Sequence, residues 1–409
     1  MLRRVLKQKI RPAEVTSSLL TALTIAFATP ALSYAQAGSD NGRPFMDRGQ
    51  QLSERSGPQF LQRFEVVDTI SGITTPHGVN AMPIQGKLWV ANLSTGTASR
   101  IDVESGNVEM VVPVGSKPDL ISVDKMRQKV WITNLGSNSV SVLNADSGVK
   151  LAEIKVGNEP HGLALDQVRG RVYVANYKDN TVFMFDARTH EKLGAITVGK
   201  GPRNITLDAM TGNIFVTNMD ENTVSLVNPQ RGRELLRMPV GNKPAGLDFN
   251  ILTRTLYVSN TADGTVSVLR NGRQVKTIKV GKNPRGIQIN ILTNTVFVNV
   301  KDEGKVAVID GLTDRIRQTV KVGAENYVAS LDIMHNTLYV ANQGSNSISV
   351  VSAGASRNFG PNPGASESGP LRGFFDRDGD AGTGGRDRLG DRSDGRFGGT
   401  SNVEDALVN

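Results

Sequence analysis

Seven positions recur at a nearly constant spacing in the middle of the chain, and most of them carry side chains that can do chemistry. The intervals between them are 42, 42, 42, 42, 40 and 42 residues. They are His77, Asp119, His161, Arg203, Ala245, Arg285 and Tyr327, each preceded by proline except the last, which follows Asn326. Imidazole and carboxylate groups can transfer protons or bind a metal, and guanidinium groups bind anions. The segments around these prolines also contain four lysines: Lys117, Lys200, Lys243 and Lys282.

A repeat of the sequence itself must position these residues. One apolar pattern returns as LWVAN (88–92), WITN (131–134), VYVAN (172–176), IFVTN (214–218), LYVSN (256–260), VFVNV (296–300) and LYVAN (338–342). Short apolar segments separated by Gly, Asn and Asp predict four strands per unit in an antiparallel meander. Because such a sheet cannot bury both of its faces alone, neighbouring sheets must stack. Four-stranded units of ~40–45 residues are typical of a β-propeller.

The ends of the repeat region predict that its first strand closes the ring. The seventh unit has three expected strands, over 328–333, 337–342 and 347–352, and lacks a fourth. The segment FEVVDTI (64–70) precedes Pro76 at the spacing that the fourth strand has in other units. Closure would remove the exposed sheet edges of an open stack. We therefore predict an all-β, seven-bladed β-propeller over 64–353, closed by an N-terminal strand.

The repeat resembles that of the YVTN-type β-propellers of exported and surface-layer proteins of bacteria and archaea. The motifs VYVAN, LYVSN and LYVAN carry this resemblance, together with the recurring Val-Gly pairs. That group is similar in fold to quinoprotein-like and lactonase-like propellers. The resemblance covers residues 64–353 and implies the fold, but it implies no single activity, because propellers carry many unrelated functions.

Other recurring residues have structural roles in this interpretation. The aromatic residue of each second strand is expected to pack between sheets, because aromatic side chains bury a large area. These residues are Trp89, Trp131, Tyr173, Phe215, Tyr257, Phe297 and Tyr339. The Asn or Asp residues that end most first and second strands are expected to hold the following turns. One unit is two residues shorter than the rest, and Asn271-Gly272 predicts a two-residue hairpin turn there.

Three flanking segments are predicted outside the propeller. Residues 1–37 are predicted to be a signal peptide, since a basic start and an apolar stretch precede a small-x-small site at 35–37. Half of the formal net charge of +8 lies in this segment. Residues 38–63 are interpreted as a linker and 354–409 as a disordered Gly/Asp/Arg-rich tail. We expect a periplasmic or extracellular protein that has no membrane span once the signal is removed.

The residue types also limit the chemistry. The chain has no cysteine, which excludes disulfides, thiolate metal sites and c-type haem attachment. It has no Gly-x-Ser-x-Gly or His-Glu-x-x-His motif, and no dinucleotide-binding glycine motif between a strand and a helix. We therefore predict no cofactor and no metal site.

The residues after the prolines are expected to gather around one mouth of the central channel, because equivalent loops of all blades share a face. We expect an exported, non-catalytic protein whose ring residues and neighbouring lysines bind a protein, an envelope polymer or an anionic small molecule. The resemblance to lactonase-like propellers implies an alternative, an enzyme of the lactonase or carbon–oxygen lyase type that uses His77, Asp119 and His161. Nucleic-acid binding through the basic loops is a further alternative, with Tyr327 as the sole aromatic residue of the ring.

Overall fold

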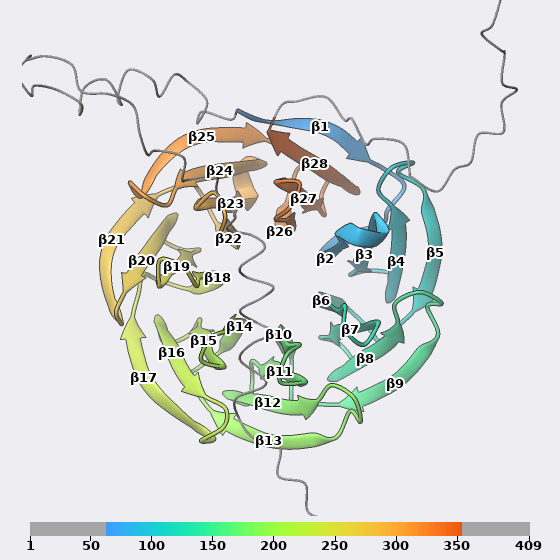
Figure 1. Cartoon of the computed structure of the whole chain (residues 1–409), viewed down its shortest axis with the longest axis horizontal. Helices are drawn as coiled ribbons and strands as arrows, with labels where there is room; N and C mark the ends of the chain where they lie inside the picture. Colours follow the sequence, from blue (N-terminus) through green and yellow to red (C-terminus); the bar gives the residue numbers. More distant parts are fainter. Residues whose placement is uncertain (1–62, 354–409) are drawn as a thin grey trace, which may run out of the picture. The chain divides into compact units, whose positions relative to one another are not determined.

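The computed structural model describes residues 63–353, which form a closed ring of seven β-sheets (Figure 1). This confirms the predicted all-β, seven-bladed propeller. Within the described residues, no helix is long and apolar enough to cross a membrane. The predicted signal peptide (1–37), the linker (38–63, except its last residue) and the tail (354–409) lie outside the described residues.

Each sheet, or blade, has four antiparallel strands, and its first strand lies nearest the centre of the ring (Figure 1). Blade 1 contains β2 (Pro76–Met82), β3 (Lys87–Asn92), β4 (Thr97–Asp102) and β5 (Val108–Pro113). Blade 2 contains β6 (Pro118–Asp124), β7 (Lys129–Asn134), β8 (Ser139–Asn144) and β9 (Lys150–Lys155). Blade 3 contains β10 (Pro160–Asp166), β11 (Arg171–Asn176), β12 (Thr181–Asp186) and β13 (Lys192–Thr197).

The remaining blades follow the same plan. Blade 4 contains β14 (Pro202–Asp208), β15 (Asn213–Asn218), β16 (Thr223–Asn228) and β17 (Arg233–Pro239). Blade 5 contains β18 (Pro244–Asn250), β19 (Thr255–Asn260), β20 (Thr265–Arg270) and β21 (Arg273–Lys279). Blade 6 contains β22 (Pro284–Asn290), β23 (Thr295–Val300), β24 (Lys305–Asp310) and β25 (Arg315–Lys321). Blade 7 contains β26 (Asn326–Asp332), β27 (Thr337–Asn342), β28 (Ser347–Ala353) and, on its outer edge, β1 (Phe64–Ile70).

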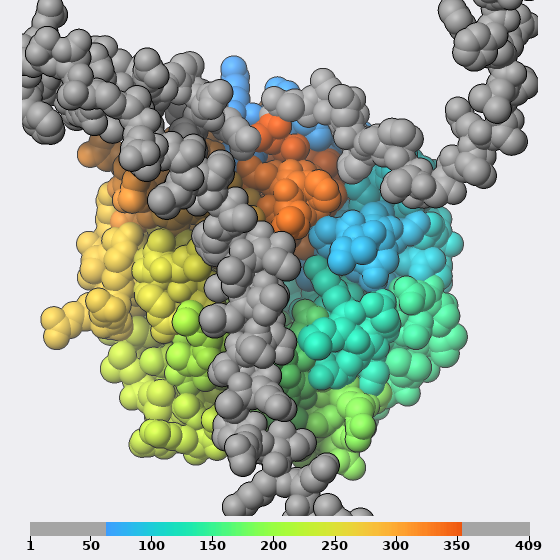
Figure 2. All heavy atoms as spheres, viewed as in Figure 1, coloured from blue at the N-terminus to red at the C-terminus, as the bar shows by residue number. Residues whose placement is uncertain are grey.

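The last blade joins the two ends of the described chain. β1 pairs antiparallel with β28, from Phe64 opposite Ala353 to Ile70 opposite Ile348, with one register shift between Val66 and Asp68. The first and last described segments accordingly lie side by side in the space-filling view (Figure 2). The predicted closure by the N-terminal strand is therefore confirmed.

The hydrophobic core lies between neighbouring blades. Trp89 of blade 1 is fully buried in a cluster that includes Ile121 and Ile132 of blade 2. Tyr257 of blade 5 belongs to a cluster with Val298 of blade 6. All seven second-strand aromatic residues are at most 8% exposed. Their predicted role in packing between sheets is confirmed.

Side chains at the strand ends hold the turns, as predicted. The Asp124 carboxylate accepts hydrogen bonds from the backbone N–H groups of Met126 and Arg127, both at 3.1 Å. Asn134, at the end of a second strand, donates to the hydroxyls of Ser139 and Ser141 at 3.1 and 2.9 Å. Blade 6 has Val300 in place of this Asn, and a 3-10 turn, η3 (Lys301–Glu303), follows it. A second 3-10 turn among the described residues is η2 (Pro83–Gln85), which follows β2.

The shorter repeat has the predicted two-residue hairpin turn. Arg270 pairs directly with Arg273, which leaves only Asn271 and Gly272 between β20 and β21. Their φ angles are 51° and 76°. Two consecutive positive φ values define the turn type that matches the twist of a hairpin. The two-residue deletion therefore leaves the strand register unchanged.

Candidate functional site

Six of the seven recurring residues that the sequence analysis singled out line one cavity at an end of the central channel. The cavity encloses about 370 Å³ of empty space, part of which is open to solvent. These lining residues are His77, Asp119, Arg203, Ala245, Arg285 and Tyr327. Each is the second residue of an innermost strand, so the repeat brings residues from six blades to one place. The seventh, His161, contacts two of them directly.

Glycines allow the innermost strands to approach closely enough to form this cavity. A Cβ on Gly78 would lie 2.4 Å from the carbonyl oxygen of Asp119, and one on Gly246 would lie 2.1 Å from that of Arg285. Both distances are shorter than any allowed contact, so only glycine fits. The Pro-x-Gly sequence at 76–78, 160–162, 244–246 and 284–286 is the signal for this feature, which the sequence analysis missed.

The four lysines of the ring loops lie outside the cavity. Lys117, Lys200, Lys243 and Lys282 are all exposed, and none of them lines it. Lys243 forms an ion pair with Asp220, with 2.9 Å between Nζ and Oδ1. The residue before each inner strand has a positive φ, including 50° at Lys117 and 55° at Lys243. All four lysines lie in the loops that lead into innermost strands (β6, β14, β18 and β22), and none of them is among the residues that line the cavity.

The centre of the site is a carboxylate held between two imidazoles. Asp119 Oδ1 lies 2.9 Å from Nδ1 of His77, and Oδ2 lies 2.6 Å from Nδ1 of His161. The three residues are only 3%, 6% and 6% exposed, with Asp119 the most buried. Burial alone would raise the pKa of Asp119, but His161 and His77 outweigh it and hold this pKa well below its ordinary value. The carboxylate is therefore ionised and fully occupied by the two rings.

His161 is fixed in a neutral tautomer by its two partners. Its Nε2 lies 3.1 Å from Nη1 of Arg203. A guanidinium can only donate, so Nε2 accepts and Nδ1 carries the proton that is donated to Asp119. Burial lowers the pKa of His161, opposed by Asp119 and reinforced by Arg203. Both ring nitrogens are therefore engaged, and this ring cannot act as a base while Arg203 stays in place.

His77 is arranged differently. Its Nδ1 faces Asp119, and its ring lies against Tyr327, with 4.5 Å between the ring centres. No residue of the described part of the chain binds its Nε2. Because His77 lines the cavity, this nitrogen is the better placed of the two to meet a ligand.

The guanidinium groups of Arg203 and Arg285 both line the cavity, and neither is paired with a carboxylate among the described residues. The Arg285 guanidinium lies 5.5 Å from the centre of the Tyr327 ring. Burial lowers its pKa, and the neighbouring charge of Arg203 lowers it further. Its Nε is buried and has no hydrogen-bond partner among the described residues. Neither arginine forms an ion pair within this part of the chain, since Asp119 is held by the histidines.

Lys301 is a further cation near the site that the sequence analysis missed. Its ammonium lies 4.8 Å from the centre of the Tyr327 ring. It follows directly after Val300, where blade 6 departs from the repeat, and this departure was the available signal. The tyrosine ring therefore lies close to His77, Arg285 and Lys301 together, and it also lines the cavity.

The His77–Asp119–His161 trio forms a hydrogen-bonded chain and does not have the arrangement of metal ligands. Each carboxylate oxygen faces one Nδ1, and a metal would have to displace these bonds. Among the described residues, no group of three or more His, Cys, Asp or Glu residues could hold a metal ion.

Comparisons with known proteins are consistent with this architecture. The family model of the methylamine dehydrogenase heavy chain matches residues 110–209. Hydrazine synthase of Kuenenia stuttgartiensis superposes with a TM-score of 0.62 at 18% identity, over 68% of this chain and 96% of that chain. A streptogramin B lyase has a TM-score of 0.61 at 14% identity, over 71% and 98% of the two chains.

Virginiamycin B lyase from Staphylococcus aureus is similar to the same degree, with a TM-score of 0.61 at 14% identity, over 71% of this chain and 99% of that chain. No curated protein matches the chain in sequence. Together these likenesses support the seven-bladed propeller fold. At such identities they bear on the fold alone.

Proposed function

We propose that the protein binds an anionic group, a carboxylate or a phosphate, in the channel-mouth cavity. The observation that carries the proposal is the pair Arg203 and Arg285. Both line the cavity, neither forms an ion pair within the described residues, and the Nε of Arg285 is buried without a partner. Both guanidinium groups are partly buried, where a paired anion stabilises their charge, and their planar donors match two-oxygen anions. Arg203 already donates to His161, so an anion seated between the two arginines would supply the counter-charge that both lack and a hydrogen-bond acceptor for Arg285.

The surroundings of the arginines favour a ligand with both an anionic and an apolar part. Ala245 and the Tyr327 ring line the cavity beside the guanidinium groups. The exposed lysines around the mouth would attract anions toward it over a longer range. A small acid, or an acidic group of a protein or an envelope polymer, would fit this arrangement. With the predicted signal peptide, this describes an exported, non-catalytic binding protein of the periplasm or the extracellular space.

Calorimetric titration with inorganic phosphate tests the proposal. Arg285→Gln removes one of the two guanidinium groups, and Lys200→Gln is a matched control that removes one exposed charge on the same face. A charge-assisted hydrogen bond contributes ~1.5–3 kcal/mol, so we expect Arg285→Gln to weaken phosphate binding about tenfold to a hundredfold. Lys200→Gln should change it less than about twofold, because exposed charges are screened. Equal effects of the two variants, or no binding to the unmodified protein, would refute the proposal.

A lactonase- or lyase-like enzyme is the second candidate, and the geometry of His77 favours it. Asp119 orients this ring through Nδ1, and Nε2 has no partner among the described residues. An imidazole oriented by a carboxylate can act as a general base. The test is turnover of a panel of lactones and of streptogramin B by the purified chain. Catalysis that disappears in His77→Gln would support this candidate, and absence of turnover over the whole panel would remove it.

A further inference from the structure

His77 can change its charge at only one ring nitrogen, the one that no described residue binds. Its Nδ1 lies 2.9 Å from Oδ1 of Asp119. Because a carboxylate only accepts hydrogen bonds, Nδ1 carries a proton in both the neutral and the charged form of the ring. The other nitrogen, Nε2, belongs to a ring that is only 6% exposed and lines the cavity. A proton that His77 gains or loses is therefore gained or lost at Nε2, where a ligand of the cavity would meet it.

His161 differs from His77 at this same nitrogen. Its Nε2 accepts a hydrogen bond from Arg203 at 3.1 Å, so a proton there would break this bond and place two positive groups in contact. Burial lowers the pKa of His161, and Arg203 lowers it further against the opposing effect of Asp119. One carboxylate also serves both rings, and it can neutralise only one imidazolium. His77 is therefore the ring of this pair that can take up a proton.

The charges nearest to His77 are those of two guanidinium groups and one carboxylate. The ionisable groups that face the ring are, in chain order, Asp119 on β6, His161 on β10, Arg203 on β14, Arg285 on β22 and Tyr327 on β26. Farther out, Lys301 on η3 lies 3.8 and 3.7 Å from carboxylate oxygens of Asp302 and Glu325, which offset its charge. Lys117, just before β6, is exposed, so solvent screens its charge. The inner groups thus have one positive charge in excess and oppose a proton on His77.

An anion between the arginines would reverse this balance. Arg203, Arg285 and His77 line one cavity of about 370 Å³, so an anion that contacts the guanidinium groups also lies close to the imidazole. In the neutral ring, Nε2 holds a lone pair and would face the oxygens of the anion, acceptor against acceptor. A proton on Nε2 makes this nitrogen a donor and adds an attractive charge. Binding of the anion and binding of the proton therefore favour each other.

We propose that an anion binds in the cavity together with one proton, which Nε2 of His77 takes up from the solvent. Such uptake rests on the proposed anion-binding function and regulates it by pH. The proton leaves a buffer acid and forms an N–H bond with the lone pair of Nε2, so that the imidazolium lies between Asp119 and the anion. Because coupling between two ligands is reciprocal, the anion strengthens proton binding by the same factor as the proton strengthens anion binding. Anion affinity should therefore rise as the pH falls.

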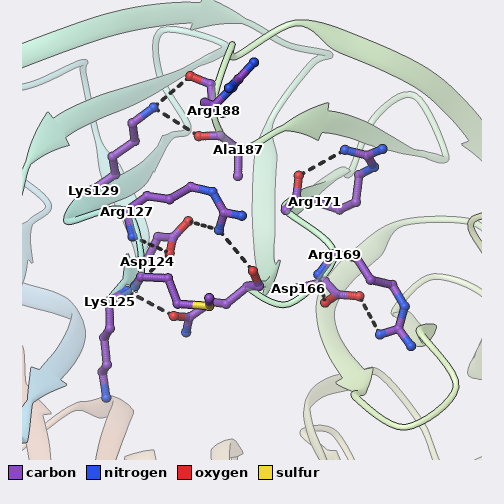
Figure 3. Close-up of polar contacts among 12 residues, drawn as sticks. Asp124, Lys125, Arg127, Lys129, Asp166, Arg169, Arg171, Ala187 and Arg188 are labelled. Carbon is purple, nitrogen blue, oxygen red and sulfur yellow. Dashed lines mark hydrogen bonds and ion pairs between the residues drawn. The ribbon is translucent and has the colours of Figure 1, made fainter. Parts of the chain in front are cut away.

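A second imidazole–carboxylate pair, at the opposite end of the channel, provides a matched control. Nδ1 of His335 lies 2.6 Å from Oδ2 of Asp332, but the His335 side chain is 61% exposed. This pair stands at and after the end of β26, whereas the cavity residue Tyr327 stands near the start of that strand. The same turn position holds an arginine bound to an aspartate in blades 2 and 3, as Figure 3 shows, Arg127 with Asp124 and Arg169 with Asp166. His335 therefore belongs to a set of turn contacts away from the cavity.

Calorimetric titration of the full chain with sulfate measures the proton uptake, because sulfate keeps its charge between pH 6 and pH 9. The binding enthalpy is compared in two buffers that differ in ionisation enthalpy, at several pH values in this range. We expect a net uptake of up to one proton per sulfate, and a sulfate affinity that falls at least about fivefold from pH 6 to pH 9. His77→Gln keeps an amide donor near Asp119 but cannot titrate, so its proton uptake should vanish and its affinity should depend far less on pH. His335→Gln should behave as the unmodified protein does.

Sulfate binding without proton uptake in the unmodified protein would overturn the proposed coupling and leave the proposed function intact, whether or not the variants fold. Uptake that persists in His77→Gln would also overturn it, since the proton would then bind elsewhere. Asp248 on β18 is the alternative acceptor, because burial raises its pKa from 3.8 to about 6, and Asp248→Asn would then remove the uptake. If sulfate does not bind at all, the coupling is refuted, and the phosphate titration with Arg285→Gln decides separately whether the proposed function fails as well.

Discussion

Asp119 and His161 lie 42 residues apart, on the innermost strands of adjacent blades, and their side chains meet with 2.6 Å between Oδ2 and Nδ1. One repeat length thus brings an acid and an imidazole into direct contact. The same carboxylate reaches His77 on the preceding blade at 2.9 Å. Three consecutive blades are therefore linked by one buried anion at the channel mouth.

Replacing this anion is expected to shift the titration of His161. Burial lowers the pKa of His161, while Asp119 raises it through its charge and its hydrogen bond. In Asp119→Asn the charge is lost, burial and Arg203 remain, and the pKa of His161 should fall further. An NMR titration with labelled histidine, assigned with His161→Gln, measures this value. A rise in the pKa would contradict the assignment of Asp119 as the group that opposes burial.

A second carboxyl group, Asp248 on β18, predicts a pH dependence of stability. It accepts hydrogen bonds from the N–H groups of Phe249 and Ile289 and from the Thr206 hydroxyl. Burial nonetheless raises its pKa from 3.8 to about 6. Because the folded state favours the protonated form, the contribution of this group to stability is greatest below pH 3.8 and is lost as the pH rises through about 6.

Asp248→Asn should therefore stabilise the protein at neutral pH. The gain is at most about 2 kcal/mol, because one pKa unit corresponds to ~1.4 kcal/mol and the side chain is only partly buried. Urea unfolding at pH 4 and pH 7 measures it, and the two proteins should differ more at pH 7. An Asn variant that is less stable at pH 7 would show that the carboxylate contributes bonds which the amide cannot replace.

Ring closure is predicted to depend on Phe64. This residue is 1% exposed at the start of β1, and its ring meets that of Phe297 in blade 6 edge to face at 5.0 Å. Removal of a buried phenylalanine costs ~3–5 kcal/mol, so Phe64→Ala should lower the free energy of unfolding by about that amount. Val67→Ala, on the same strand but 38% exposed, should cost less than about 0.5 kcal/mol. If both variants unfold at the same denaturant concentration, the packing of Phe64 does not contribute to the stability of the closed ring.

Replacing glycine by alanine should destabilise the protein by different amounts at two turns, the two-residue hairpin turn at Gly272 and the turn at Gly232. Gly272 has a φ of 76°, and a Cβ there would lie 2.9 Å from Leu236 Cδ2. Gly232 has a φ of 61° and no atom within 4 Å of its Cβ position. Gly232→Ala should cost about 1 kcal/mol of backbone strain. Gly272→Ala should cost more, because Leu236 must also move, and thermal unfolding of the two variants gives the order. The reverse order would contradict this account.

The sequence alone determined the architecture of the protein. The repeat determines which segments form strands and which form turns. Because one four-stranded sheet cannot bury both of its faces, neighbouring sheets have to stack. The segment FEVVDTI had to return to the seventh unit, because no other strand completes it. The same spacing placed His77, Asp119, Arg203 and Arg285 at one mouth of the channel.

Only the tertiary structure decided how those side chains are used. A repeat specifies where each Cα lies, but the direction of a side chain depends on neighbours 42 or more residues away. The contact of both histidines with one carboxylate, the tautomer of His161 and the lack of a partner for Arg285 Nε all arise from such neighbours. The raised pKa of Asp248 has the same origin, since it depends on how three blades pack around one carboxyl group.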